Sequence, residues 1–257
     1  HYRTRDKTGN KRSEMNKNWL KNLQISKRQG EKRFAVLLDP DKIPSGEELY
    51  NWLNEIEQSG ATDILIGGSH LSKGNTEELV KNAKKQTSLP VVLFPGSPEQ
   101  VTEHADVLLF LSLVSGRNAD LLIGRHVEAA PLIMAMDIET VATAYLLVGD
   151  GPLTTAAYIT QTLPIPAAKP ELAVATASAA VLLGMQAVYL DAGSGAANSI
   201  PTEVVSAVSN AVEVPIIVGG GIRDFEGMER AWAAGADLVV LGTVLEKVRD
   251  FSQLTPS

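Results

Sequence analysis

The sequence has no cysteine, and aromatic residues make up only 5% of its 257 residues. Without cysteine, a disulfide framework and a thiolate metal site are both excluded. The four histidines, at positions 1, 70, 104 and 126, form no close pair of the kind that binds zinc. The absence of thiols fits a reducing compartment, and we expect the protein to be cytoplasmic.

Positive charge is also scarce, since 23 lysines and arginines stand against 30 acidic residues and give a net charge of −7. A nucleic-acid-binding surface needs an excess of positive charge, so we expect no nucleic-acid partner. A long apolar run is missing as well. Leu172 to Leu190 carries no charge, but its alanine, serine and threonine content and Gly184 make it weakly apolar for a membrane span. We interpret it as a buried helix followed by a buried strand, and expect at most peripheral membrane contact.

The first fourteen residues, His1 to Glu14, are polar and charged. We expect them to form a flexible, non-native tail upstream of a natural start at Met15, and a native disordered arm is the alternative. Residues 15–257 show no linker and no low-complexity segment. With 44% hydrophobic and 21% charged residues overall, the chain is typical of a globular protein, and we expect residues 15–257 to form one catalytic domain.

Short apolar runs recur along this domain, separated by amphipathic or polar segments. They are apolar at nearly every position, which is typical of parallel strands covered on both faces. The predicted strands are Phe34–Leu38, Ile64–Ile66, Val91–Phe94, Val107–Leu111, Ala144–Val148, Ala187–Leu190, Ile216–Val218 and Leu238–Leu241. Helical patterns lie between them at Gly46–Gln58, Glu77–Gln86, Glu171–Leu183, Thr202–Val212 and Phe225–Ala234, and Val244–Val248 begins the last helix.

This alternation predicts an α/β fold, a single-domain (β/α)8 TIM barrel, because eight strands in a chain of this length favour closure over an open sheet. Three segments are irregular. Pro95–Asp106 is short for a full helix, whereas the segment around Met134–Thr143 and the loop Gly149–Lys169 are long. The loop is either a lid or substrate wall at the barrel mouth or a passive surface excursion, and the sequence favours neither.

Three glycine-bearing segments follow the sixth, seventh and eighth predicted strands. They are Asp191-Ala192-Gly193-Ser194-Gly195, Gly219-Gly220-Gly221-Ile222-Arg223 and Gly242-Thr243. Glycine lets backbone N–H groups approach an anion without a Cβ in the way, and loops at these strand ends often bind phosphate in barrels. One such segment alone would be read as a tight turn, but three at successive strand ends predict a phosphate site.

An acidic turn, Asp39-Pro40-Asp41-Lys42, ends the first predicted strand, and Gly67-Gly68-Ser69-His70 ends the second. Asp39 at the carboxyl end of a barrel strand is either a functional group or a turn residue. One carboxylate and the hydroxyl of Ser69 can hold Mg²⁺, an ion that prefers oxygen ligands and often takes the rest of its shell from substrate phosphates. We interpret His70 as a hydrogen-bonded neighbour of the site.

The segment after the fourth predicted strand offers two further polar side chains. Arg117 could meet a diphosphate with two parallel hydrogen bonds. Asn118 is expected to cap the helix that follows, which is the commoner use of asparagine at such a position.

The segments Leu37–Lys42, Gly67–Ser69, Tyr189–Ala196, Val218–Arg223 and Leu241–Thr243 together carry a family resemblance. The chain resembles the geranylgeranylglyceryl phosphate synthases and their bacterial heptaprenylglyceryl phosphate relatives, over roughly residues 17–248. The glycine-rich segments are shared with many phosphate-binding barrels. The tyrosine-led segment beside the Asp-Pro-Asp-Lys turn is much more specific.

The resemblance implies a TIM-barrel prenyltransferase of ether-lipid synthesis that is a homo-oligomer. Such an enzyme joins sn-glycerol 1-phosphate to a polyprenyl diphosphate, here expected to be geranylgeranyl diphosphate, and releases diphosphate. It implies Mg²⁺ as cofactor, with Asp39 and Ser69 at the metal positions, and Asp191 and Tyr189 as catalytic residues. The implied glycerol-phosphate site consists of Tyr189, Leu190, Asp191, Ala192, Gly193, Ser194, Gly195, Gly219, Gly220, Gly221, Gly242 and Thr243.

One residue departs from the family pattern, which usually has glutamate where this chain has Asp191. The shorter side chain means that the substrate lies closer, that a water bridges the gap, or that activity is lower. We expect function to persist, because the reaction needs only a carboxylate to receive the proton of the attacking glycerol hydroxyl. We further expect Asp39 and Asp191 to face each other across the barrel mouth. Apolar residues of Ala173–Leu183 or the Gly149–Lys169 loop are candidates to line a groove for the prenyl chain.

Two other functions stay open on sequence grounds, since a fold alone does not fix a function. The first is a phosphosugar isomerase or lyase, which needs a paired acid and base, and Asp191 has no convincing partner beyond Asp39. The second is a barrel that binds a phosphate metabolite without turning it over, which the departure at Asp191 keeps open.

Overall fold

The structure, a computed structural model, describes residues 18–151 and 154–242. Within these ranges eight parallel strands close into a barrel in sequence order, and the first strand pairs with the last. The strands are β1 (Arg33–Leu38), β2 (Asp63–Ile66), β3 (Val91–Leu93), β4 (Val107–Leu113), β5 (Glu139–Leu147), β6 (Ala187–Asp191), β7 (Ile216–Gly219) and β8 (Leu238–Leu241). The predicted TIM barrel is therefore confirmed. The tail, Thr243 and the predicted start of the last helix lie outside the described residues.

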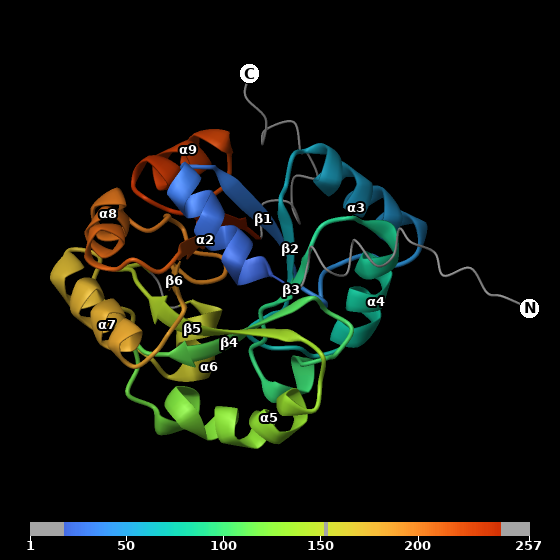
Figure 1. The fold of residues 1–257 in the computed structure, drawn as a ribbon, viewed down its shortest axis with the longest axis horizontal. Coiled ribbons are helices and arrows are strands. Elements are labelled where there is room, and N and C mark those ends of the chain that lie inside the picture. The colour runs from blue at the N-terminus through green and yellow to red at the C-terminus, as the bar shows by residue number, and fades with distance from the viewer. Residues whose placement is uncertain (1–17, 152–153, 243–257) are drawn as a thin grey trace, which may run out of the picture.

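Helices surround the barrel, most of them as an outer ring (Figure 1). They are α2 (Trp19–Gln29), α3 (Glu47–Gln58), α4 (Thr76–Gln86), α5 (Arg125–Met134), α6 (Thr155–Thr160), α7 (Pro170–Leu182), α8 (Thr202–Ala211) and α9 (Phe225–Ala233). In α3 the buried residues Leu49, Trp52, Leu53 and Ile56 are three and four positions apart, so they form one apolar face towards the barrel. The third connection holds only a short 3₁₀ helix, η1 (Pro98–Gln100), as its short length predicts.

Several elements differ from the sequence prediction. Helices α2, α5 and α6 are additional, and β5 begins at Glu139 rather than at Ala144. The pattern of α5 is obscured by Pro131 inside it and by the π-helical turn η2 (Asp120–Gly124) that leads into it. The start of β5 is polar, and its Glu139 side chain contacts a segment far away in the sequence. The Glu139 carboxylate accepts hydrogen bonds from the N–H groups of Trp19 and Leu20, at 2.7 and 2.9 Å.

The barrel interior is a packed core. Alternate residues of each strand point to opposite sides, so one set fills the interior and the other contacts the helices. Buried interior residues include Ala35, Leu65, Val92, Leu109, Val141, Tyr189, Ile217 and Val240. The set that packs against the helices includes Val36, Ile64, Leu190 and Val218. A substrate site must therefore lie at an end of the barrel.

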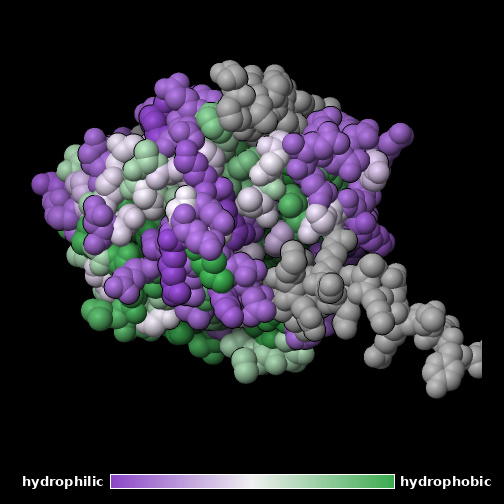
Figure 2. Space-filling view, turned by 45° about the horizontal axis from the view of Figure 1, so that its top comes forward, coloured by the Kyte–Doolittle hydropathy of each residue, from purple (hydrophilic) through white to green (hydrophobic). Residues whose placement is uncertain are grey.

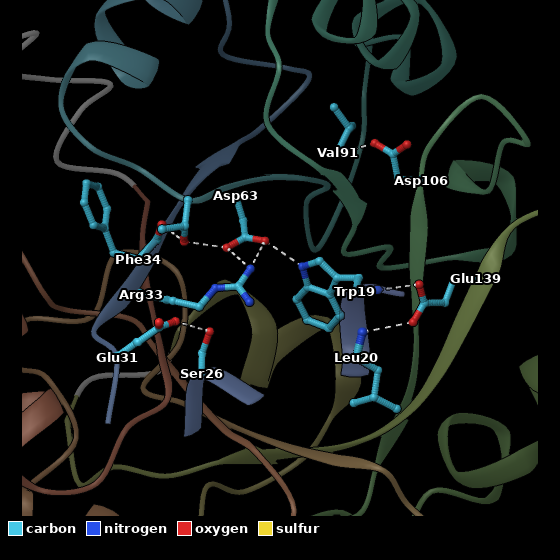
Figure 3. Close-up of polar contacts among 11 residues, drawn as sticks. Trp19, Leu20, Ser26, Glu31, Arg33, Phe34, Asp63, Val91, Asp106 and Glu139 are labelled. Carbon is cyan, nitrogen blue, oxygen red and sulfur yellow. Dashed lines mark hydrogen bonds and ion pairs between the residues drawn. The ribbon is translucent and has the colours of Figure 1, made fainter. Parts of the chain in front are cut away.

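Helix α2 closes the amino-terminal end, where it crosses in front of the strands in Figure 1. Trp19 and Leu23 are fully buried against the interior residues. The indole Nε1 of Trp19 donates to Asp63 Oδ1 at 2.6 Å, and Arg33 donates to both oxygens of Asp63 at 2.7 and 2.8 Å (Figure 3). With Glu139 at the start of the helix, these contacts fix α2 over the barrel end opposite the strand carboxyl ends.

Replacing Asp63 by alanine is expected to lower the free energy of unfolding by about 3 kcal/mol, because it leaves the Arg33 guanidinium buried without its charged partner. Chemical denaturation followed by circular dichroism measures the change. The matched control is Glu229→Ala, which removes the partner of Lys32 in an exposed ion pair and is expected to change stability by less than about 1 kcal/mol. Equal effects of the two variants would contradict this role for Asp63.

The uncharged stretch Leu172 to Leu190 forms most of α7 and β6, as predicted, but α7 is not buried throughout. Ala173, Ala177 and Ala180 are buried, whereas Leu182 and Leu183 are 88% and 82% exposed. Among the described residues, no helix is both long enough and apolar enough to cross a membrane. The space-filling view shows a mixed surface with apolar patches along its lower edge (Figure 2).

Candidate active site

A cavity of about 470 Å³ opens at the carboxyl ends of the strands, opposite α2. It is lined by residues from the ends of β1, β2, β3, β6, β7 and β8, so segments far apart in the sequence meet there. The sequence-predicted residues that line it are Asp39, Ser69, Tyr189, Asp191, Gly193, Ser194, Gly195, Gly220, Gly221 and Gly242. The early carboxylate and the late glycine segments therefore face one opening.

Three predicted residues do not line this cavity. Leu190 is fully buried and points to the helix layer, because it alternates with the inward-facing Tyr189 and Asp191. Ala192 packs against the same layer. Gly219 lies beneath the Tyr189 ring, where a Cβ would come within 2.4 Å of the phenol oxygen. These residues shape the site without offering it a side chain.

The glycine segments after β6 and β7 take backbone conformations that favour glycine. The φ angles of Gly193, Gly220 and Gly221 are 94°, 82° and 72°. A Cβ on Gly221 would lie 2.3 Å from the carbonyl oxygen of Asn198, and one on Gly220 would lie 2.6 Å from Asp191 Oδ1. Side chains are thus excluded on both grounds, which leaves backbone amides to line this part of the cavity.

Two charged residues hold the same region together. The Arg223 guanidinium lines the cavity and donates to the carbonyl oxygens of Ala196 and Ala197, at 3.4 and 3.1 Å, so it ties the loop after β7 to the loop after β6. Asp224 caps α9 through the amide of Gly227, at 2.7 Å. Since α9 carries its own carboxylate cap, an anion here would rest on the loop amides and on Arg223.

Alanine at Gly221 is expected to raise KM for a phosphate-bearing substrate about tenfold, because a side chain at this φ is strained and would push against Asn198. Steady-state kinetics measures the change. Gly149→Ala is the matched control, since a Cβ there meets no atom within 4 Å and the backbone is not left-handed. An unchanged KM in Gly221→Ala would remove this loop from the phosphate site.

Asp191 is the buried carboxylate of the cavity, at 7% exposure. Burial raises its pKa above the usual value, while hydrogen bonds from Tyr145 and from the Gly193 amide act in the opposite direction. The Tyr145 hydroxyl donates to Oδ2 at 2.5 Å, and the Gly193 N–H donates to Oδ1 at 2.8 Å. A carboxylate held in this way, with a raised pKa, is suited to accept a proton.

Tyr145 is a site residue that the sequence prediction missed. It lies inside the apolar run of β5, and the register of β5 with β6 places it opposite Tyr189. Its ring lies edge-on to Tyr189 and to Phe94, with centroids 5.6 and 5.8 Å apart, and Phe94 stacks on Tyr189 at 4.8 Å. A phenol within the apolar run Ala144–Val148 is the one signal that could have pointed to it.

Asp39 and Ser69 lie at the other side of the cavity, at the ends of β1 and β2. Asp39 Oδ2 pairs with Lys42 at 2.9 Å, and Oδ1 accepts the Asp41 N–H at 3.1 Å. A Cβ on Gly68 would come within 3.1 Å of Asp39 Oδ1, so glycine is what lets the carboxylate lie against the backbone next to Ser69.

This donor set fits a magnesium ion that is shared with a substrate. A carboxylate offers four lone-pair sites and a hydroxyl two, and Mg²⁺ commonly takes one or two carboxylates and completes its shell with phosphates and water. Among the described residues, no group of three or more His, Cys, Asp or Glu side chains gathers to hold a metal. An ion at Asp39 and Ser69 would therefore depend on oxygens of the ligand.

A neighbouring carboxylate, Asp41, fixes the loop after β2. Its oxygens accept the N–H groups of Ser72, Lys73 and Gly74 and the Ser72 hydroxyl, at 2.5 to 3.1 Å. These bonds hold the pKa of Asp41 well below its usual range. Asp41 therefore stabilises the loop after β2, while Asp39 is the carboxylate of this turn that lines the cavity.

The other polar residues singled out in the sequence are not among those that line the main cavity. His70 is exposed and lines a neighbouring hollow of about 850 Å³ that shares Ser69 with the cavity. Arg117 turns to its own loop and donates to the carbonyl oxygen of Gly116 at 2.6 Å. Asn118 accepts the Asp120 N–H at 3.1 Å and so caps the turn that leads into α5, as predicted.

An apolar hollow of about 90 Å³ lies under the short third connection. It is lined by Pro95, Pro98, Val101, Phe110, Leu121 and Ile133, among others. The larger hollow shares Gly96, Ser97 and Pro98 with it, so a continuous lining leads from Ser69 to the apolar surface between η1 and α5. Residues 173–183 line neither hollow, and of the 149–169 loop only Ile159 lines the larger one.

Comparisons with known proteins match this chain over nearly its whole length. The model of the PcrB family matches residues 27–254. The geranylgeranylglyceryl phosphate synthase of Flavobacterium johnsoniae is 47% identical over 226 residues, which cover 88% of this chain and 93% of that protein. That of Chitinophaga pinensis is 44% identical over 221 residues, which cover 86% and 87%.

A solved structure is also similar throughout. The crystal structure of (S)-3-O-geranylgeranylglyceryl phosphate synthase from Thermoplasma acidophilum, in complex with its substrate sn-glycerol-1-phosphate, has a TM-score of 0.84 and 32% sequence identity. The match covers 91% of this chain and 94% of that one. The family match includes every residue named above as lining the main cavity.

Proposed function

Because the chain belongs to the PcrB family, we propose that it is a prenyltransferase that joins sn-glycerol 1-phosphate to a polyprenyl diphosphate through an ether bond. Diphosphate is released in the reaction. The observation that carries the proposal is the shared cavity, in which Asp191 and the glycine loops face the same opening as Asp39 and Ser69. The similar proteins named above supply the substrate class.

The glycerol phosphate is held at the late side of the cavity. Backbone amides of the loops after β6 and β7, with Arg223, neutralise the phosphate. Asp191 then lies beside the glycerol backbone, and its carboxylate accepts the proton of the attacking hydroxyl as the C–O bond forms. The shorter side chain that replaces the usual glutamate keeps this role, since both of its oxygens already have fixed donors.

The diphosphate is held at the early side of the cavity. Lys42 lines this side and supplies one positive charge. We propose Mg²⁺ as the cofactor, held by Asp39 and Ser69 together with phosphate oxygens. When bound, it would neutralise the charge that develops on the departing diphosphate.

The prenyl chain follows the lining that runs from Ser69 towards η1 and α5. The apolar hollow under the third connection exists because η1 is too short to cover the outer face of β4. We propose geranylgeranyl diphosphate as the donor, since the two similar proteins from Flavobacterium johnsoniae and Chitinophaga pinensis are named for that chain length.

The assay that tests this function mixes the protein with labelled sn-glycerol 1-phosphate, Mg²⁺ and prenyl diphosphates of several lengths. Product extracted into organic solvent is expected with the geranylgeranyl donor, and less with sn-glycerol 3-phosphate. Chelation with EDTA is expected to abolish turnover. Absence of ether product with every donor and with both enantiomers would overturn the proposal and leave a phosphate-binding barrel of another function.

We also propose that the enzyme is a homo-oligomer in the cytoplasm, with at most peripheral contact to the membrane that receives its product. Exposed apolar side chains on the outer helices support an interface. They are Val127, Leu132 and Met134 on α5, and Leu182 and Leu183 at the end of α7, each more than half exposed. Light scattering coupled to size-exclusion chromatography measures the mass, and a monomer at all concentrations would contradict this.

A further inference from the structure

Tyr145 contacts Asp191, the candidate base, from the barrel interior. Its strand, β5, pairs with β6 so that Tyr145 lies opposite Tyr189 and Leu147 lies opposite Asp191. Among the described residues, the cavity is lined by Asp191, Tyr189 and Phe94 but not by Tyr145. The phenol hydroxyl therefore reaches the carboxylate from within the barrel, on the side away from the substrate.

The hydrogen bond from Tyr145 is the second of two that hold the Asp191 carboxylate in one orientation. Its hydroxyl donates to Oδ2 at 2.5 Å while the Gly193 N–H donates to Oδ1 at 2.8 Å. Two donors on different oxygens define the plane of the carboxylate, and lone pairs remain for a substrate hydroxyl. Rotation of the side chain would break both bonds inside a buried site.

The ring of Tyr145 is itself held in place. It lies edge-on to Phe94 and to Tyr189, with interplanar angles of 71° and 64°, while those two rings stack at 19°. Three aromatic side chains, one each from β5 and β6 and one from the residue that follows β3, thus form a packed layer beneath the cavity. Such a layer limits where the hydroxyl can point and keeps water from the bond.

We propose that Tyr145 is a positioning residue that holds the Asp191 carboxylate in the ionised, fixed form that receives the substrate proton. This rests on the proposed function in assigning the proton to Asp191. Tyr145 lies on β5, outside the segments that carry the family resemblance, and it is not among the residues that line the cavity.

The direction of the effect on ionisation follows from the donor. Burial raises the pKa of Asp191, and the hydrogen bond from Tyr145 opposes that rise because it stabilises the charged form. Burial and the neighbouring carboxylate raise the pKa of the Tyr145 phenol well above its usual value, so it stays protonated and remains a donor. Removal of the hydroxyl therefore raises the pKa of Asp191 further.

Other titratable groups around Asp191 are few. Tyr189 on β6 is the second adjacent phenol, and its pKa is also raised by burial and by Asp191. From β7, the neighbours are Gly219 and Gly220, which do not titrate. The charged groups elsewhere in the cavity lining are Asp39, Lys42, Arg223 and Asp224. They are unchanged by a substitution at Tyr145, so a difference between variant and wild type reports the lost hydrogen bond.

The direct test measures the ionisation of Asp191 without turnover. Carbon-detected NMR of protein labelled at the aspartate carboxyl, with the signal assigned through Asp191→Asn, gives its titration in the wild type and in Tyr145→Phe. We expect the apparent pKa to rise by about one unit in Tyr145→Phe, since a hydrogen bond to a charged group changes proton affinity about tenfold. An unchanged titration would overturn the proposal whether or not the protein is a prenyltransferase.

Kinetics supplies the second readout. In Tyr145→Phe, we expect kcat near neutral pH to fall about tenfold, with KM for glycerol phosphate changed less than threefold. The acidic limb of the pH profile is expected to move to higher pH, so that the loss is smaller in alkaline buffer. A purely structural defect would lower activity equally at every pH and would contradict the proposal.

Two control variants separate these effects. Tyr158→Phe removes an exposed phenol on α6 and is expected to leave activity and pH profile unchanged. Tyr189→Phe removes the other buried phenol of the same aromatic layer, and we expect it to affect KM without moving the acidic limb. A wild-type enzyme without ether product, together with a shifted Asp191 titration in Tyr145→Phe, would count against the proposed function alone.

Discussion

Asparagine at position 191 is expected to lower kcat at least about 100-fold, because the variant lacks the group that accepts the proton of the glycerol hydroxyl. The geometry around the residue should persist, since the amide oxygen can accept the Gly193 N–H while the amide NH2 donates to the Tyr145 hydroxyl oxygen. The affinity for sn-glycerol 1-phosphate should change less than threefold, because the phosphate rests on the glycine loops. Steady-state kinetics and calorimetric titration measure the two quantities.

Asp191→Glu is the informative companion variant. It restores the side chain that the family usually has and keeps the charge, so a smaller loss than in Asp191→Asn is expected. A gain in activity would show that the shorter side chain limits the natural enzyme. Retention of more than a tenth of wild-type kcat in Asp191→Asn would show that the proton goes elsewhere.

Asparagine at position 39 is expected to abolish Mg²⁺-dependent turnover while glycerol phosphate binding stays nearly intact. Asp39 and the late glycine loops lie at different sides of the cavity. The substitution should therefore impair the binding and departure of diphosphate rather than the binding of glycerol phosphate. An amide is a far weaker ligand for Mg²⁺ than a carboxylate. The dependence of rate on Mg²⁺ concentration, measured at saturating glycerol phosphate, reports the effect.

The matched control for Asp39 is Glu47→Gln, which removes one negative charge from the exposed start of α3, outside the cavity lining. It is expected to leave the Mg²⁺ dependence unchanged. Full activity in Asp39→Asn at the same Mg²⁺ concentration would remove Asp39 from the metal site.

Local patterns were sufficient to predict the barrel and most of its cavity. Buried parallel strands are apolar at almost every position, so all eight were found, with ends that shift by a few residues. The glycine segments were also recognisable, because Gly193, Gly220 and Gly221 take conformations that other residues adopt only with strain. The features that could be predicted are therefore those that depend on residues close together in the sequence.

Features that depend on distant pairing were missed. Tyr145 looks like one more buried residue of β5, and only its register with β6 brings its hydroxyl to Asp191. Likewise, the carboxylate of Glu139, at the start of β5, accepts the N–H groups of Trp19 and Leu20 at the start of α2, about 120 positions away in the sequence. Neither contact can be predicted from the periodicity of apolar residues along the chain.

The apolar hollow beside the main cavity shows the same limit. Residues 173–183 are apolar in composition but line neither neighbouring hollow, and Leu182 and Leu183 are exposed on the outside of the barrel. The apolar hollow lies where the third connection is too short to form a full helix. The short segment was visible in the sequence, but the surface that it uncovers required the fold.

The central claim is that the late glycine loops and the early carboxylate hold two substrates in one cavity. A crystal structure of the protein with sn-glycerol 1-phosphate, Mg²⁺ and a non-reactive prenyl diphosphate analogue tests it most directly. We predict phosphate oxygens within about 3 Å of amides from the loops after β6 and β7, a glycerol hydroxyl at Asp191, and the diphosphate at Asp39 and Ser69. Glycerol phosphate bound away from these loops, or a diphosphate that avoids Asp39, would contradict the account.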